Sequence, residues 1–88
     1  MLQRALVELR AAFPDGLPES DYFPLLAVLA DYFSEVNLGR VVAELVDGEI
    51  VVVRNDVAAV QGFRRPRPEV VAAMRDHLTS AGFQFDAY

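Results

Sequence analysis

The chain has 88 residues, no cysteine and a net charge of −5, and 53% of its residues are hydrophobic. This length predicts one domain over residues 1–88 with a thin core, the missing cysteines exclude disulfides and thiolate metal ligands, and the acidic balance disfavours a general nucleic-acid-binding surface. Because no apolar run reaches the ~18 residues of a membrane span and no cleavable basic leader is visible, we expect a cytoplasmic protein without a membrane partner.

The first predicted element is a helix over residues 2–12. Its apolar residues repeat at steps of four, three and four, which places them on one helix face. These residues are Leu2, Leu6, Leu9 and Phe13. Glu8 is expected on the outer face, beside Arg4 and Arg10. Pro14 ends the helix, because the residue before a proline avoids the helical region, and Asp15-Gly16 completes a turn.

A second helix is predicted to follow the extended pair Leu17-Pro18. Asp21 is the expected N-cap, with its carboxylate accepting from first-turn amides. Pro24 would then lie in the first turn, where a missing N–H costs nothing. The segment continues to Phe33 with a wide apolar face, which suits the centre of a bundle.

A third helix is predicted from about Glu35 to Val46. Ser34 is its N-cap candidate, and Phe33 can pack on Leu38 as a hydrophobic staple. Its inward residues are expected to be Leu38, Val41, Val42 and Leu45. Gly39 either weakens this helix or permits close packing. Asp47-Gly48 ends it.

The segment Glu49–Val53 is rich in β-branched residues, which favour a strand. Since a lone strand has no partner in a helical chain, we predict an extended buried connector there. Asn55 then caps a short fourth helix from Asp56 to about Gln61. Residues 63–67 form a linker, and the last helix begins at Pro68.

The last helix is expected to bury an apolar stripe and to stop at Gly82, with Phe83 packing back on Leu78 in a Schellman ending. The stripe consists of Val70, Val71, Met74 and Leu78. Together these elements predict an all-α fold: a compact bundle of four main helices plus one short helix, with little or no sheet.

The motifs in this order resemble an actinobacterial family of small proteins known as domain-of-unknown-function family 3349. The first motif runs from Phe13 to Leu29, and the last runs from Pro68 through Ala81-Gly82-Phe83. The resemblance implies a compact bundle of four or five helices and no assigned activity. The sequence departs from the family pattern at Arg67, where a small polar N-cap is usual, and in its β-branched run at Val51–Val53.

No residue set in the sequence indicates catalysis. His77 is the single histidine, and a structural role is expected for it because no nucleophile or metal-ligand set accompanies it. The acidic residues Asp15, Glu19 and Asp21 suit turn and cap chemistry better than a cation site. We therefore expect no enzyme activity, no catalytic residue, no cofactor and no metal.

Two surfaces are candidates for contact with a partner. One is the cluster Arg64, Arg65 and Arg67, which could meet phosphates or an acidic protein. The other consists of the aromatic residues Phe85 and Tyr88. The leading hypothesis is a protein-interaction module with an unknown protein partner. The alternatives are a helix-turn-helix-like nucleic-acid binder using the arginines, and an enzyme or ligand-binding protein built around a bundle pocket. The oligomeric state stays open.

Overall fold

The computed structural model describes residues 2–88, which form five α-helices and two short 3-10 helices and contain no strand. The α-helices are α1 (Leu2–Ala12), α2 (Tyr22–Leu29), α3 (Glu35–Val46), α4 (Ile50–Val60) and α5 (Pro68–Ser80). The 3-10 helices are η1 (Glu19–Asp21), directly before α2, and η2 (Phe85–Ala87), near the C-terminus. The all-α prediction is confirmed.

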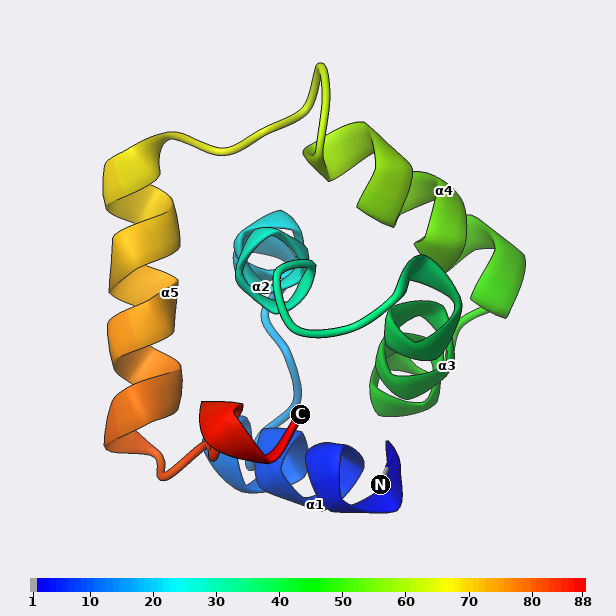
Figure 1. The fold of residues 1–88 in the computed structure, drawn as a ribbon. Helices are drawn as coiled ribbons and strands as arrows, with labels where there is room; N and C mark the ends of the chain where they lie inside the picture. The colour runs from blue at the N-terminus through cyan, green and yellow to red at the C-terminus, as the bar shows by residue number, and fades with distance from the viewer. Residues whose placement is uncertain (1) are drawn as a thin grey trace.

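Helix α2 forms the centre of the fold. Figure 1 looks along this helix and shows the other four α-helices around it. Every residue from Pro24 to Leu29 is buried, as expected for a helix that is apolar on all sides. Pro24 is the third residue of α2, where its missing N–H leaves no helical hydrogen bond unmade. The prolines and the glycine before α2 therefore turn the chain and insert it between α1, α4 and α5.

Two predicted helix ends are confirmed by their hydrogen bonds. The Ser34 hydroxyl oxygen accepts from the backbone N–H of Asn37 at 3.1 Å, which caps α3. At the end of α5, Gly82 has a φ of +88°, and the N–H of Phe83 donates to the carbonyl of Leu78 at 2.9 Å. This is the Schellman geometry, in which glycine is favoured because positive φ carries no Cβ penalty.

Helices α3 and α4 pack closely against each other. Gly39 on α3 is buried, and a Cβ atom placed on it would lie 2.6 Å from Cγ of Arg54 on α4. Of the two predicted roles for this glycine, the structure supports close packing. Asp47 ends α3 in the left-handed conformation with a φ of 55°, and the N–H of Gly48 donates to the carbonyl of Ala43 at 2.8 Å.

The predicted extended connector over residues 49–53 is wrong, because α4 begins at Ile50. The helix buries Val53, Val57 and Val60, which recur at steps of four and three. Each valine in a helix costs only a few tenths of a kcal/mol relative to better helix formers. A buried strand without a partner would leave its backbone N–H and C=O groups unpaired, which costs more.

Two predicted helix boundaries and one predicted capping hydrogen bond also differ from the structure. Asn55, the expected N-cap of a short helix, lies inside α4. Asp21 precedes α2 but its side chain makes no capping hydrogen bond, because η1 runs directly into α2 and supplies backbone carbonyls to its first amides. Helix α2 ends at Leu29, and a hydrogen-bonded turn over residues 30–33 leads to the cap of α3.

Candidate functional site

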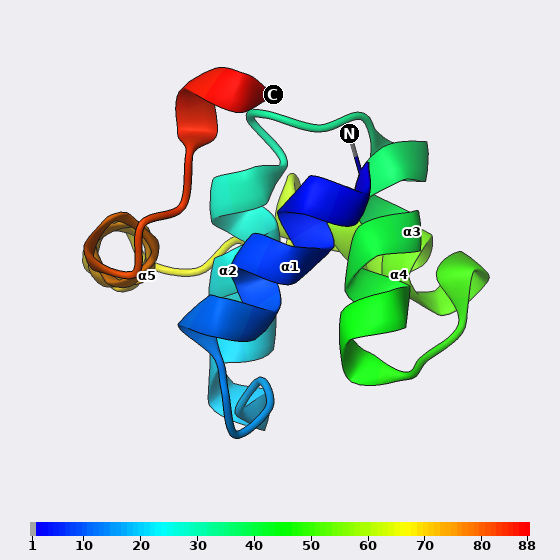
Figure 2. The same ribbon diagram turned by 90° about the horizontal axis from the view of Figure 1, so that it is seen from below.

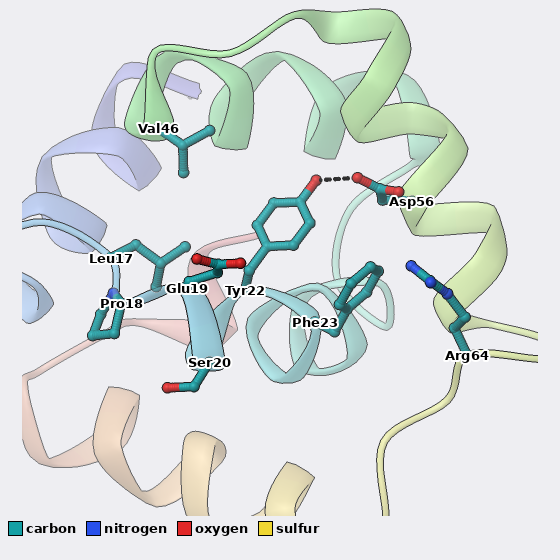
Figure 3. Close-up of a pocket in the computed structure, with 9 residues that line it drawn as sticks. All are labelled: Leu17, Pro18, Glu19, Ser20, Tyr22, Phe23, Val46, Asp56 and Arg64. Atoms are coloured by element: carbon teal, nitrogen blue, oxygen red, sulfur yellow. Dashed lines mark hydrogen bonds between the residues drawn. The ribbon is translucent and has the colours of Figure 1, made fainter.

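An open groove of about 820 Å³ lies between the start of α2 and the facing side of α4, and we call it the α2–α4 groove (Figure 3). Its apolar lining consists of Leu17, Pro18, Tyr22, Phe23 and Val46. Its polar lining consists of Glu19, Ser20, Asp56 and Arg64. A hollow of this size with mostly apolar walls and a few polar groups is typical of a binding site.

A hydrogen bond across the groove fixes its two walls relative to each other. The hydroxyl of Tyr22 donates to Oδ2 of Asp56 at 2.7 Å, which joins α2 to α4 (Figure 3). Burial, together with the hydrogen bond and the charge of Asp56, raises the pKa of Tyr22 far above its ordinary value. Tyr22 is therefore a hydrogen-bond donor, not a base. The Asp56 carboxylate has further lone pairs with which to accept a donor from a ligand.

An exposed aromatic residue is next in the chain to Arg64, which lines the groove. Phe63 is 89% exposed and directly precedes Arg64, whose guanidinium lies 5.2 Å from the centre of the Phe23 ring. The turn that carries Phe63 is held by two bonds to the carbonyl of Ala59, from the N–H of Gly62 at 3.0 Å and from the N–H of Arg64 at 2.9 Å. Phe63 thus projects from a hydrogen-bonded turn.

The three predicted arginines have different neighbours. Arg64 covers the ring of Phe23 and lines the groove. Arg67 forms an ion pair with Glu69 at 3.4 Å, and both side chains are largely exposed. Arg65 is exposed and forms no ion pair within residues 2–88. Their role in partner contact stays a prediction.

The predicted aromatic contacts, Phe85 and Tyr88, are partly buried against the chain's own core. The ring of Tyr88 lies 4.9 Å from that of Phe33. The ring of Phe85 lies 4.8 Å from that of Tyr32, and the guanidinium of Arg75 lies over it at 4.7 Å. Their use as anchors for a partner stays a prediction, although in this structure both rings are engaged within the chain.

Glu8 holds the C-terminal segment against α1, and we call this arrangement the Glu8 clasp. Its carboxylate accepts from the backbone N–H of Gln84 at 2.6 Å, the hydroxyl of Tyr88 at 3.1 Å and Nε of Arg4 at 2.9 Å. Figure 1 shows the C-terminal segment lying beside α1. The expectation that Glu8 simply points outward is therefore incomplete. Sequence reasoning missed the clasp, since its partners are far apart in the chain.

The Glu8 clasp shifts the pKa values of Glu8 and Tyr88. Desolvation by itself would raise the pKa of Glu8, but the hydrogen bonds from Gln84, Arg4 and Tyr88 together outweigh it and lower that pKa. Burial, followed by the hydrogen bond to Glu8, raises the pKa of Tyr88 to about 12. Both shifts favour a carboxylate that accepts from a neutral phenol at neutral pH.

His77 has a structural contact. Its Nε2 lies 2.9 Å from the carbonyl oxygen of Ala12, the last residue of α1, so Nε2 carries the proton and donates it. The imidazole also stacks on Phe13, with ring centres 4.9 Å apart. The histidine thereby satisfies one of the free carbonyls at the C-terminal end of α1.

Over the described range, 2–88, no group of three or more His, Cys, Asp or Glu side chains is arranged to hold a metal ion. No helix in that range is both long enough and apolar enough to cross a membrane.

Comparisons with known proteins place the chain in a family. Neither the curated proteins nor the solved structures contain a significant match to it. A family model described as "Protein of unknown function (DUF3349)" matches residues 1–87. This range includes both motifs that suggested the resemblance and nearly the whole chain. The chain therefore belongs to the DUF3349 family of proteins of unknown function.

Proposed function

We propose that this protein is a non-enzymatic interaction module of the cytoplasm, which binds a protein partner through the α2–α4 groove and the adjoining Phe63. The observation that carries the proposal is the 89% exposure of Phe63 on a turn held by backbone hydrogen bonds. An aromatic side chain has only two χ angles, so it loses little conformational freedom on binding, and aromatic residues contribute much of the energy of protein interfaces.

Exposed aliphatic residues also lie in the groove lining and on α4. Val46, which lines the groove, is 38% exposed. Val52 is 51% exposed and lies one helical turn before Asp56, on the groove side of α4. Ile50 and Val51 add 46% and 61% exposed side chains at the start of the same helix. Val46 and Val52 support a contact surface on the groove side, whereas Ile50 and Val51 point to other sides of α4, because successive helical residues lie about 100° apart around the axis.

The titratable groups that could take part in catalysis are engaged in contacts that stabilise the fold. His77 binds the end of α1, Glu8 binds the C-terminal segment, and Tyr22 donates to Asp56. A general base or nucleophile needs a free position beside a substrate. These structural roles support the non-enzymatic part of the proposal.

The alternative, a nucleic-acid binder using Arg64, Arg65 and Arg67, has less support. Arg64 lies over an aromatic ring, and Arg67 is paired with Glu69. A phosphate-binding surface requires several cations on one face, and the net charge of −5 opposes it.

Site-specific photocrosslinking in the native host tests the proposal. A photoreactive phenylalanine analogue replaces Phe63 in one variant and Val7 in a control, since Val7 is 61% exposed on α1. We expect a discrete protein adduct at position 63, unaffected by nuclease and absent at position 7. Adducts with nucleic acid, or equal adducts at both positions, would contradict the proposal.

A further inference from the structure

We infer that the α2–α4 groove receives a basic, amphipathic segment of the partner protein. This inference rests on the proposed function and adds the chemistry of the partner. The segment inserts apolar side chains between α2 and α4, and its lysine or arginine side chains lie against the acidic rim.

The rim of the groove is acidic. Glu19 and Asp56 line it, and Arg64 is the cation among its lining residues. Asp47 follows Val46 directly in the chain, Glu49 comes two residues later, and both are exposed. The connections α1–α2 and α3–α4, which carry three of these acids, lie at the same end of the molecule, at the bottom of Figure 2. Within residues 2–88, none of these four carboxylates forms an ion pair.

The apolar part of the groove has room for side chains of a partner. The whole groove is an open hollow of about 820 Å³, so side chains of a partner can reach its apolar walls. Val46 is partly exposed at its edge, and the rings of Tyr22 and Phe23 form one wall (Figure 3). An amphipathic helix fits such a groove by placing residues spaced three and four apart into it.

Charge decides between the possible occupants. A second copy of the chain carries the same net charge of −5 and the same acidic rim, so this face would repel itself. A nucleic acid or another polyanion would be repelled as well. Opposite charges across an interface speed association and suppress wrong partners, and a basic segment is the occupant that supplies them here.

The test uses a model peptide and the intact chain. The probe is a 14-residue amphipathic peptide of leucine and lysine, titrated into ¹⁵N-labelled protein. A peptide with glutamate in place of every lysine is the charge control. We expect the lysine peptide to shift the amide signals of the groove residues, and we expect the glutamate peptide to leave them unchanged at the same concentration.

Two double variants test whether the peptide binds in the groove. The double variant Glu19→Gln, Val46→Ser alters two exposed side chains of the lining. Its matched control is Asp31→Asn, Val7→Ser, which makes the same two kinds of change at exposed positions outside the groove lining. We expect the groove variant to bind the lysine peptide roughly tenfold more weakly, and the control within about twofold of the unaltered chain.

Signal shifts away from the groove, equal binding of both peptides, equal loss in both variants or no binding would overturn the inference. Failure of the peptide experiments can be distinguished from failure of the proposed function by the photocrosslinking experiment. If the photocrosslink at position 63 joins an acidic protein segment, the interaction module stands and the basic partner is wrong. If position 63 yields no protein adduct, the module itself is wrong.

Discussion

Replacing Glu8 with glutamine should release much of the energy that holds the C-terminal segment in the Glu8 clasp. The carboxylate accepts from Gln84 at 2.6 Å and from Tyr88 at 3.1 Å. Glutamine keeps the length of the side chain and one accepting oxygen, but it removes the negative charge. The stacking of Tyr88 near Phe33 should persist, because those rings are held by apolar packing.

The expected cost follows from the difference between charged and neutral hydrogen bonds. A bond to a charged group contributes about 1 kcal/mol more than a neutral bond. Two bonds tie the segment to Glu8, and Gln84 is exposed, so solvent weakens one of them. We expect Glu8→Gln to lower the free energy of unfolding by about 1–2 kcal/mol. In a domain of this size that loss corresponds to roughly 5–15 °C in Tm.

Thermal unfolding followed by circular dichroism between pH 3 and pH 8 measures this loss and its pH dependence. The pKa of Glu8 is lowered in the fold from its ordinary 4.5. Its contribution is therefore present above about pH 4.5 and is lost as the pH falls through the folded value. The difference in Tm between the unaltered chain and Glu8→Gln should shrink in acid.

Glu69→Gln is the matched control, because its ion pair with Arg67 is largely exposed and should contribute under about 1 kcal/mol. If Glu8→Gln changes Tm no more than this control does, and shows the same acid dependence as the unaltered chain, the Glu8 clasp contributes little and the reasoning is wrong.

Three further predictions concern the core, α4 and the arginines. Leu29→Ala, at a position with no exposed area, should cost about 2–5 kcal/mol in chemical denaturation, and a loss below roughly 0.5 kcal/mol would show that α2 is not central. Val51→Ala, at a 61% exposed helical position, should raise the free energy of unfolding by a few tenths of a kcal/mol, since alanine favours a helix; a loss would indicate extended backbone. Changing Arg64, Arg65 and Arg67 together to glutamine should leave Tm nearly unchanged and should not weaken binding of the leucine-lysine peptide. A nucleic-acid ligand would instead lose about three units of salt slope.

The parts of the fold that could be predicted from the sequence are those with local signals. Ser34 as a cap and Gly82 as a stop are recognisable because the residue type and the local backbone geometry are coupled. The burial of Leu6, Leu9 and Phe13 follows from their helical spacing. Each of these features depends on residues that are close to one another in the chain.

The extended connector predicted at the start of α4 is wrong because local preference and tertiary packing conflict there. The β-branched residues from Ile50 to Val53 favour a strand. Burial of Val53, Val57 and Val60 along one helix face outweighs that preference. The helical spacing of Val53, Val57 and Val60 can be seen in the sequence only when residues beyond Asn55 are included. Over that longer segment the helical spacing predicts the structure better than the strand preference of Ile50–Val53 does.

The candidate site depends on contacts that no local pattern contains. The groove needs Tyr22 beside Asp56, and the Glu8 clasp needs Glu8 beside Tyr88. Single-sequence reasoning cannot pair residues this far apart without alignment or structure. The sequence predicts a linker that begins at Phe63, but it does not show that the Phe63 side chain is exposed. The hydrophobic fraction of 53% is accompanied by exposed aliphatic residues on α4.

The most direct test of the proposed interface is the affinity of the crosslinked partner, once identified and purified, for Phe63→Ser and for Val7→Ser. Both variants remove an exposed apolar side chain, so both should fold and melt like the unaltered chain. By isothermal titration calorimetry, we expect Phe63→Ser to raise the Kd at least roughly tenfold and Val7→Ser to leave it unchanged. Equal affinities for the two variants would contradict the assignment of the partner to this face of the protein.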